Sequence, residues 1–205
     1  MKYKYVIFDI DGTLVDNEKA VIATWQKTIN QLLGKYYKVS ELDFVLGIPG
    51  ETSMQRLGIE NPQEAFKVWS ENFMVLKSEI ELFPDIEKTI LGLRSKEVDL
   101  GLVTSRTRDE LNNDYALCQI IDNFNTIICV TDTLRPKPYP DPLLAYLTQC
   151  GLSAQDALYV GDSDYDGQCA KSAGVDFGLA MWGKSNSRNM DAKFVFETPL
   201  DILNI

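Results

Sequence analysis

Two aspartates, Asp9 and Asp11, follow an apolar run near the start of the chain, in the sequence Asp9-Ile10-Asp11-Gly12-Thr13. Residues two apart on extended backbone project to the same side, so their carboxylates are expected to lie close together. Like charges placed in this way raise the pKa of one group unless a cation lies between them. The motif alone is equally compatible with a turn or with a fragment of a calcium loop. It therefore predicts a functional site only if other polar groups join it.

Polar side chains also follow three later strand candidates. They are Thr104-Ser105-Arg106, Lys137 in the segment 135–138, and Asp162 with Asp166 in the segment 161–166. Ligands of open parallel sheets bind beyond the carboxyl ends of the strands, so these loops are expected to form one site. Each residue also has a simpler interpretation: Thr104 as a strand-end hydroxyl, Lys137 as a solvated charge, and Asp162 as a helix N-cap, although Ser163 would cap equally well. The succession of four such strand ends favours the composite site.

The acidic members of this site, Asp9, Asp11, Asp162 and Asp166, predict a hard divalent metal. Oxygen ligands without histidine or thiolate suit Mg²⁺, which binds a few carboxylates and keeps several waters. Thr104 and Lys137 would then hold phosphate oxygens, as would backbone N–H groups at helix starts. The chain contains no histidine. A Ser-His-Asp triad, a Cys-His pair and a histidine-ligated metal are therefore excluded, and carboxylates or lysine must perform acid–base chemistry.

Composition places the 205 residues among globular proteins of one or two domains, with 45% hydrophobic and 24% charged residues. The formal charge of −10 argues against nucleic acid as a partner. No apolar run is long enough for a transmembrane helix, and the apolar stretch at the amino terminus is too short for a signal peptide. The four cysteines have irregular spacing and are expected to be buried free thiols in a reducing compartment, which predicts a cytoplasmic protein. The sequence does not determine the oligomeric state.

Strands alternate with helices over most of the chain, which predicts an α/β fold with a Rossmann-like, doubly wound parallel sheet. Strands are expected at residues 3–8, 98–103, 126–130, 157–160, 177–181 and 193–196, and helices at 85–95, 108–117, 142–150 and 165–173. From Asp16 to about Ile80 the apolar spacing is helical, and no strand is expected there. The sequence thus predicts a core of residues 1–15 and 82–205 and an inserted helical domain of residues 16–81. Trp25 and Trp69 are expected to pack in the core of this helical domain.

Four segments resemble the motifs of the haloacid dehalogenase-like hydrolase superfamily. They are FDIDGTLVD at 8–16, LVTSR at 102–106, KPYPDPL at 137–143 and VGDSDYD at 160–166. The helical insertion after the first motif resembles the small cap domain of the phosphoglycolate phosphatase and β-phosphoglucomutase branch, and the segment 81–96 resembles the return of that branch into the core. The resemblance covers the whole chain.

The resemblance implies a role for each matching residue. Asp9 would attack phosphorus and form an aspartyl-phosphate, and Asp11 would protonate the leaving oxygen and then deprotonate water. Mg²⁺ would be held by the Asp9 carboxylate, the Asp11 backbone carbonyl and Asp162, with Asp166 as ligand support. Thr104, Ser105 and Lys137 would bind the phosphoryl group, and the peptide bond between Lys137 and Pro138 would be cis. Because dehalogenases of the superfamily lack the second acid, Asp11 favours a phosphatase.

Three positions depart from the family pattern. Asp85 stands where the family often has glycine, and this difference affects only the expected geometry of the hinge. Gly50, in the cap loop 47–53, stands where the mutase carries an arginine that binds the distal phosphate of the sugar. Arg106, at the end of the second motif, is an uncommon residue at that position of the family. It could bind a substrate anion, face solvent or pair with a nearby acid. The preferred hypothesis is a Mg²⁺-dependent phosphatase of a small phosphorylated metabolite, with Gly50 lining the substrate site. The alternatives are a β-phosphoglucomutase-like mutase and a non-catalytic sensor of phosphorylated ligands.

Overall fold

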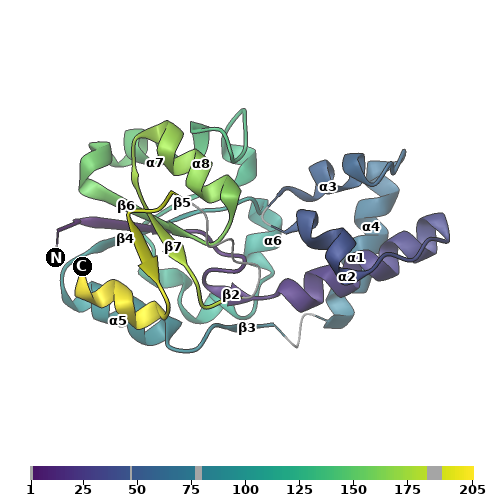
Figure 1. The fold of residues 1–205 in the computed structure, drawn as a ribbon, viewed down its shortest axis with the longest axis horizontal. Helices are drawn as coiled ribbons and strands as arrows, with labels where there is room; N and C mark the ends of the chain where they lie inside the picture. The colour runs from purple at the N-terminus through teal and green to yellow at the C-terminus, as the bar shows by residue number, and fades with distance from the viewer. Residues whose placement is uncertain (1, 47, 77–79, 184–190) are drawn as a thin grey trace.

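The computed structural model describes residues 2–46, 48–76, 80–183 and 191–205. Six of its strands form one sheet in the order β5-β4-β1-β6-β7-β8, and all neighbours in this sheet are parallel (Figure 1). These strands are β1 (Tyr5–Phe8), β4 (Asp99–Val103), β5 (Thr126–Ile128), β6 (Ala157–Gly161), β7 (Asp176–Ala180) and β8 (Phe194–Phe196). The order and direction of the strands confirm the predicted doubly wound α/β fold.

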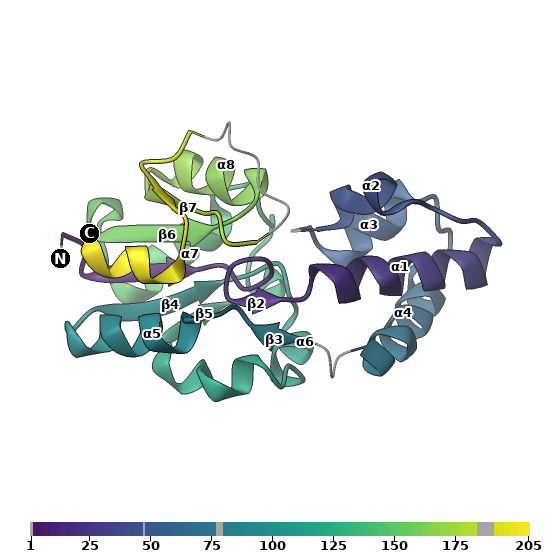
Figure 2. The same ribbon diagram turned by 60° about the horizontal axis from the view of Figure 1, so that its bottom comes forward.

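The central strand β1 shows how the apolar sequence builds both faces of the sheet. Val6 and Phe8 belong to one buried cluster, whereas Ile7 belongs to the other, because successive side chains of a strand point to opposite faces. Helices α5 (Ile86–Ser95) and α6 (Arg108–Asn112) and the 3₁₀ helix η7 (Pro199–Asn204) contribute to the first cluster, and α7 (Asp141–Cys150) and α8 (Asp164–Ala173) to the second. Figures 1 and 2 show the sheet between these two layers.

The helices between Asp16 and Glu81 form a separate group at one end of the sheet (Figure 2). They are α1 (Glu18–Leu33), α2 (Val39–Leu42), the 3₁₀ helix η1 (Asp43–Val45), α3 (Gly50–Arg56) and α4 (Pro62–Leu76). Their apolar faces form a third buried cluster. In it, as predicted, Trp25 packs against Trp69, with ring centroids 6.0 Å apart, and Trp69 stacks on Phe73 at 4.7 Å. None of the helices in the described part of the chain is long and apolar enough to span a membrane.

The prediction that no strand lies between Asp16 and about Ile80 is wrong at Asp16, and the strand at Glu81–Leu82, just beyond that stretch, was not predicted. Strand β2 (Val15–Asp16) pairs antiparallel with β3 (Glu81–Leu82), so the two chain crossings between sheet and helices lie side by side. Each strand has only two residues, which is too short to leave a periodic signal in the sequence.

Two other predicted elements end early. The helix predicted at 108–117 ends at Asn112, because the Asp114 carboxylate accepts a hydrogen bond from the Leu117 N–H at 2.8 Å and starts a new turn. The strand predicted at 126–130 ends at Ile128, because the Asp132 carboxylate accepts from the Cys129 N–H at 2.8 Å. Further 3₁₀ turns are η3 (Leu117–Gln119), η4 (Ile121–Asn123), η5 (Val130–Asp132) and η6 (Ala154–Asp156).

The four cysteines are free thiols, as predicted. Cys129 and Cys169 are buried and Cys150 is half-buried, but Cys118 is exposed, so the prediction of burial is wrong for this residue.

Candidate active site

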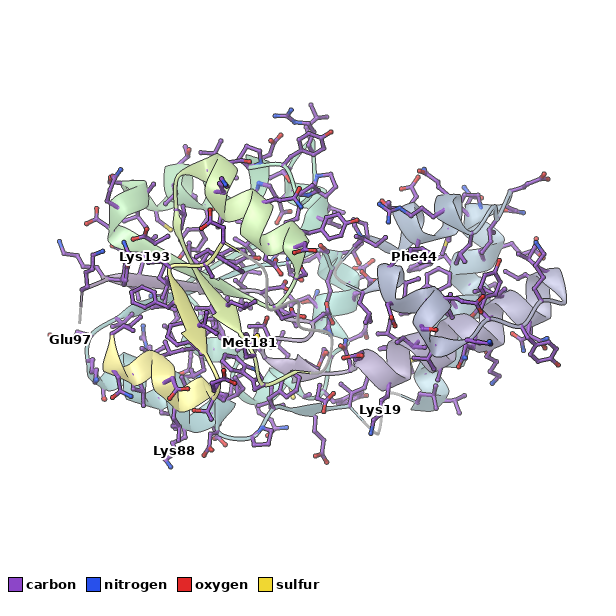
Figure 3. All side chains as sticks on the ribbon, in the orientation of Figure 1. Lys19, Phe44, Lys88, Glu97, Met181 and Lys193 are labelled. Carbon is purple, nitrogen blue, oxygen red and sulfur yellow. The ribbon has the colours of Figure 1, made fainter. Side chains whose placement is uncertain are left out.

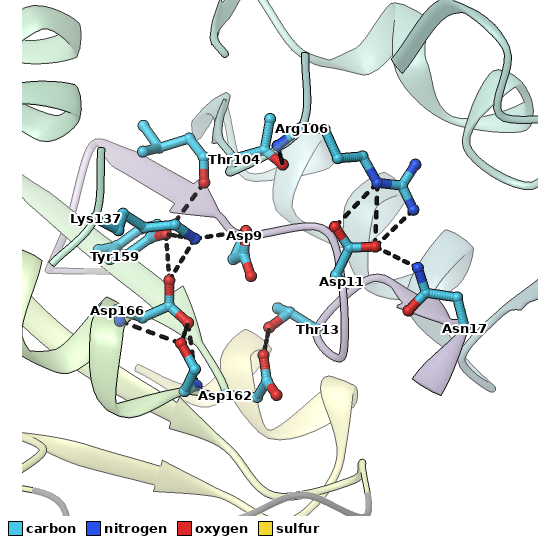
Figure 4. Close-up of polar contacts among 12 residues, drawn as sticks. Asp9, Asp11, Thr13, Asn17, Thr104, Arg106, Lys137, Tyr159, Asp162 and Asp166 are labelled. Atoms are coloured by element: carbon cyan, nitrogen blue, oxygen red, sulfur yellow. Dashed lines mark hydrogen bonds and ion pairs between the residues drawn. The ribbon is translucent and has the colours of Figure 1, made fainter. Parts of the chain in front are cut away.

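The carboxyl ends of three adjacent strands bring the candidate residues together (Figure 4). Asp9 follows β1, and its N–H donates to the Val160 carbonyl of β6 at 2.9 Å. Thr104 follows β4 and is buried, and its hydroxyl accepts from the Arg106 N–H at 3.1 Å. Asp162 follows β6 and is buried as well. Neighbouring parallel strands therefore place these groups at one sheet edge, as the sequence predicts.

Lys137 lies between two buried carboxylates. Its ammonium is 2.8 Å from the Asp9 carboxylate and 2.6 Å from that of Asp166, and all three side chains are almost fully buried. The interpretation of Lys137 as a solvated surface charge is thus wrong. These two carboxylates raise the pKa of Lys137 against the effect of its burial, so the lysine stays charged. The peptide bond between Lys137 and Pro138 is cis, as predicted.

Asp166 is held by groups on three sides. One carboxylate oxygen accepts from Lys137 and from the Tyr159 hydroxyl at 2.8 Å, and the other accepts from the N–H and the hydroxyl of Ser163 at 3.0 and 2.5 Å. Ser163 in turn caps helix α8, so the N-cap is Ser163 and not Asp162. Burial would raise the pKa of Asp166, but Lys137 and the hydrogen bonds lower it below the ordinary value. Asp166 therefore positions Lys137 and is bonded at both oxygens.

Asp9, Asp162 and Asp166 form a group that could hold a metal ion. One carboxylate oxygen of each lies within 4.8 Å of the others, and all three residues are buried. The Thr13 hydroxyl donates to Asp162 at 3.1 Å. Burial raises the pKa of Asp9 to about 7 although Lys137 favours the carboxylate, and burial with the charges of Asp166 and Asp9 raises the pKa of Asp162 well above its usual value. Carboxylates that resist ionisation in this way are stabilised by an added cation.

The carboxylate of Asp11 lies outside this group and faces Arg106. The Arg106 guanidinium donates to Asp11 at 2.7, 3.0 and 3.1 Å and also binds Asp114, and Asn17 donates to Asp11 (Figure 4). Burial opposes ionisation of Asp11, but Arg106 lowers its pKa below the ordinary value. The Asp11 carboxylate is not part of the acidic group of Asp9, Asp162 and Asp166, because β1 ends at Phe8 and the chain turns at Gly12, whose φ is 77°.

A cavity of about 710 Å³ opens between the sheet edge and the inserted helices. Asp11, Ser105, Arg106 and Asp162 line it from the sheet, and Gly50 lines it from α3. Trp25 and Trp69 are also among its lining residues, in addition to their packing role. In Figure 3, Phe44, another lining residue, lies on the side of the helical group that faces the sheet.

Asp85 adopts a left-handed conformation, with φ of 63°, just before helix α5. Glycine adopts this conformation without strain, and aspartate is among the residues that tolerate it. The cap loop predicted at 47–53 is wrong for Gly50–Ser53, which form the first turn of helix α3. Gly47 lies outside the described residues.

Four residues of the site were not predicted from the sequence: Thr13, Asn17, Asp114 and Tyr159. Tyr159 was assigned to a buried strand, and nothing in its strand pattern shows that its hydroxyl reaches Asp166. Thr13 lies within the first aspartate motif and Asn17 directly follows it, so the polar side chains in and beside that motif were the available signal. The contact between Asp114 and Arg106 arises from the tertiary structure, and no sequence pattern indicates it.

A buried aspartate directly after β1, a lysine and further aspartates thus lie together at one edge of a parallel sheet. The family model of the haloacid dehalogenase-like hydrolases matches residues 6–180. The chain belongs to this family. It is an enzyme, and more narrowly a phosphatase.

Relatives and solved structures agree with this assignment. The chain is 26% identical to the pyrophosphatase PpaX of Bacillus velezensis over 98% of this chain and 94% of the relative. It is also 26% identical to the phosphoglycolate phosphatase of Aquifex aeolicus, covering 98% of this chain and 96% of the relative. A crystal structure of a candidate phosphoglycolate phosphatase from Lactobacillus plantarum superimposes with a TM-score of 0.90 and 33% identity, covering 100% of this chain and 99% of the other.

Proposed function

We propose that the protein is a Mg²⁺-dependent phosphatase that hydrolyses a small phosphorylated metabolite through an aspartyl-phosphate on Asp9. The observation that carries this proposal is the contact between Asp9 and Lys137 at 2.8 Å, with Asp162 and Asp166 beside them. The helices between residues 16 and 81 would act as the cap over this site.

The residues present fit a magnesium ion. Three buried carboxylates lie within 4.8 Å of one another, and one ammonium contacts two of them, so the donor set is oxygen only and carries excess negative charge. Asp9, Asp162 and the Asp11 backbone carbonyl would hold the ion, while Asp166, already bonded at both oxygens, supports Lys137. When bound, Mg²⁺ would offset the negative charge of the transferring phosphoryl group.

The reaction has two displacements at phosphorus. In the first, a carboxylate oxygen of Asp9 bonds to phosphorus while the bond from phosphorus to the leaving oxygen breaks, and Asp11 gives that oxygen a proton. In the second, water attacks phosphorus, Asp11 takes the proton of the water, and the bond to Asp9 breaks. Thr104, Ser105 and Lys137 bind the phosphoryl oxygens throughout.

Arg106 bears on the timing of these steps. In this structure it holds Asp11 as a carboxylate, which suits the second step, in which Asp11 accepts a proton. For the first step, Asp11 must carry a proton and reach the leaving oxygen, so it has to leave Arg106. The side chain of Asp11 is about a quarter exposed, at 26%, and it lines the cavity, so it has solvent-accessible space beside it.

The nucleophile is tested with Asp9→Asn in Mg²⁺ buffer with 4-nitrophenyl phosphate. The variant should lose several orders of magnitude in kcat, as for other removed nucleophiles. Asp122→Asn, an exposed aspartate, is the matched control and should keep wild-type activity. Borohydride added during turnover should convert phosphorylated Asp9 of the wild type into homoserine, which peptide mass spectrometry detects. Turnover by Asp9→Asn above a small fraction of wild type would refute the mechanism.

The acid role of Asp11 is tested with leaving groups of different basicity. 4-Nitrophenolate leaves without a proton, whereas an alkoxide needs one. Asp11→Asn should therefore lower kcat/KM, which reports the first displacement, far more for an alkyl phosphate than for 4-nitrophenyl phosphate. Equal losses on both esters would assign Asp11 to another role.

The mutase alternative receives less support from the geometry. A mutase needs a second cationic pocket for the distal phosphate, but Gly50 presents no charge to the cavity. Arg56 of the cap donates to the Tyr165 hydroxyl at 3.0 Å and does not line the cavity, and Lys67 is exposed. Lys77 lies outside the described residues. The sensor alternative would require loss of a catalytic group, and Asp9, Thr104 and Lys137 are assembled.

A further inference from the structure

The cavity above the carboxylate group is larger than a phosphoryl group and a two-carbon leaving group need. Its volume is about 710 Å³, within the range of about 300–1,000 Å³ typical of pockets for drug-sized ligands. Asp11 and Asp162 form its floor, so a phosphoryl group bound at Asp9 would direct its leaving group into this space.

The cap side of the cavity is mainly aromatic and aliphatic. It includes Phe44, Phe66, Trp69, Phe73 and Met74, and Tyr115 adds an aromatic ring from the sheet side. Phe66, Met74 and Tyr115 are exposed by 45%, 56% and 69%. Large apolar side chains that remain exposed around a cavity mark a ligand-binding surface.

The charge of the cavity disfavours a second anionic group. Among the described lining residues, eight are acidic and one, Arg106, is a cation. Arg106 is already bound to Asp11 and Asp114, so its charge is offset within the protein. A carboxylate or second phosphate on the leaving group would face uncompensated negative charge.

From these observations we infer the substrate class: a phosphomonoester whose leaving group carries no negative charge and presents a large apolar ring to the cap. The inference rests on the proposed phosphatase function and deepens it. It separates this chain from relatives named for pyrophosphate and phosphoglycolate, since both of those compounds carry a second anionic group.

The test compares kcat/KM for alkyl phosphates whose leaving alcohols have similar basicity. 2-Phenylethyl phosphate should exceed ethyl phosphate about tenfold or more, because a ring is buried. Phosphoglycolate, which adds a carboxylate, and pyrophosphate should not exceed ethyl phosphate. A preference for either anionic substrate, or no gain from the ring, would overturn the inference while the phosphatase function stands. Hydrolysis of none of these compounds, nor of 4-nitrophenyl phosphate, would overturn both.

Two lysine variants on helix α4 locate the effect. Met74 lines the cavity and Val75 does not, and both are exposed, at 56% and 67%. Met74→Lys should lower kcat/KM for 2-phenylethyl phosphate and raise it for phosphoglycolate, whereas Val75→Lys should change neither. Equal effects of the two variants would show that the apolar wall is covered by cap closure and not by the leaving group, and would overturn the inference.

Discussion

Replacing Lys137 by methionine removes the ammonium that lies between two buried carboxylates, Asp9 and Asp166. Methionine has a similar length, so the packing changes little, but the carboxylates lose a partner at 2.8 and 2.6 Å. Removing one member of a buried ion pair costs about 3–5 kcal/mol, because a buried charge stays uncompensated. For a chain of this length, about 2–4 °C of Tm is lost per kcal/mol, so Tm should fall by about 6–20 °C.

The loss should depend on pH in metal-free buffer. In the folded protein the pKa of Asp9 is about 7, above the value of about 3.9 expected when unfolded. Between these values the folded state binds more protons, so the free energy of unfolding falls as pH rises. Without Lys137 the folded pKa of Asp9 is higher still. The Lys137→Met penalty should therefore be larger near pH 8 than near pH 5.5.

The assay is thermal and urea unfolding in EDTA, followed by circular dichroism. Lys171→Met is the matched control, since Lys171 pairs with Asp191 on the surface, with side chains 75% and 87% exposed. It should shift Tm by less than about 2 °C. The double variant Lys137→Met/Asp166→Asn should lose less than the sum of the single losses, by about 0.5–3 kcal/mol. If Lys137→Met were as stable as the control, the ion pairs would not stabilise this site.

Three further predictions concern stability. Asp162→Asn should raise the Tm of the metal-free protein, because it removes one of three mutually repelling carboxylates. It should also weaken stabilisation by Mg²⁺, which for the wild type is about 2.7 kcal/mol when the Mg²⁺ concentration is a hundred times Kd. An unchanged dependence of Tm on Mg²⁺ would contradict the assignment of Asp162 as a ligand. Glu97→Gly should stabilise the protein by about 0.5–1 kcal/mol in urea unfolding, because Glu97 is exposed and left-handed, with φ of 59°; a loss would show that its side chain makes a compensating contact. Gly101→Ala should destabilise by about 1–3 kcal/mol, since the new Cβ would overlap the buried ring of Tyr146; Gly50→Ala, whose Cβ meets nothing within 4 Å, is the control.

The sequence predicted the sheet well, because each central strand is a continuous apolar run bounded by polar turns. Its parallel direction follows from the helices between strands, and the sequence alone therefore predicts that Asp9, Thr104 and Asp162 lie at one edge. Periodicity is strong in elements of this kind and weak in short ones. Strands β2 and β3, with two residues each, could not be predicted for that reason.

The partners of individual side chains were harder to predict than the elements. Arg106 and Asp114 are eight residues apart, with helix α6 between them, so their contact depends on the residue at which α6 ends. The carboxylate of Asp11 could point toward Asp9 or away from it, and only the turn at Gly12 and the position of Arg106 decide between these directions. Hydrogen-bond partners of this kind depend on tertiary geometry, which a pattern of residue types does not contain.

The pairing of Val15 with Leu82 and of Asp16 with Glu81 makes the whole helical segment equivalent to the loop of a very small β-hairpin. The ends of the segment are fixed next to each other by the core, so its length adds only slowly to the entropy of loop closure. A replacement segment of different size and shape could leave from the same two strands without moving Asp9 or Lys137. In the proposed function, the chemistry of phosphoryl transfer and the choice of leaving group are thus encoded in parts of the chain that can change independently. Because Asn17 donates to Asp11, residues 18–80 are the natural unit for exchange between relatives.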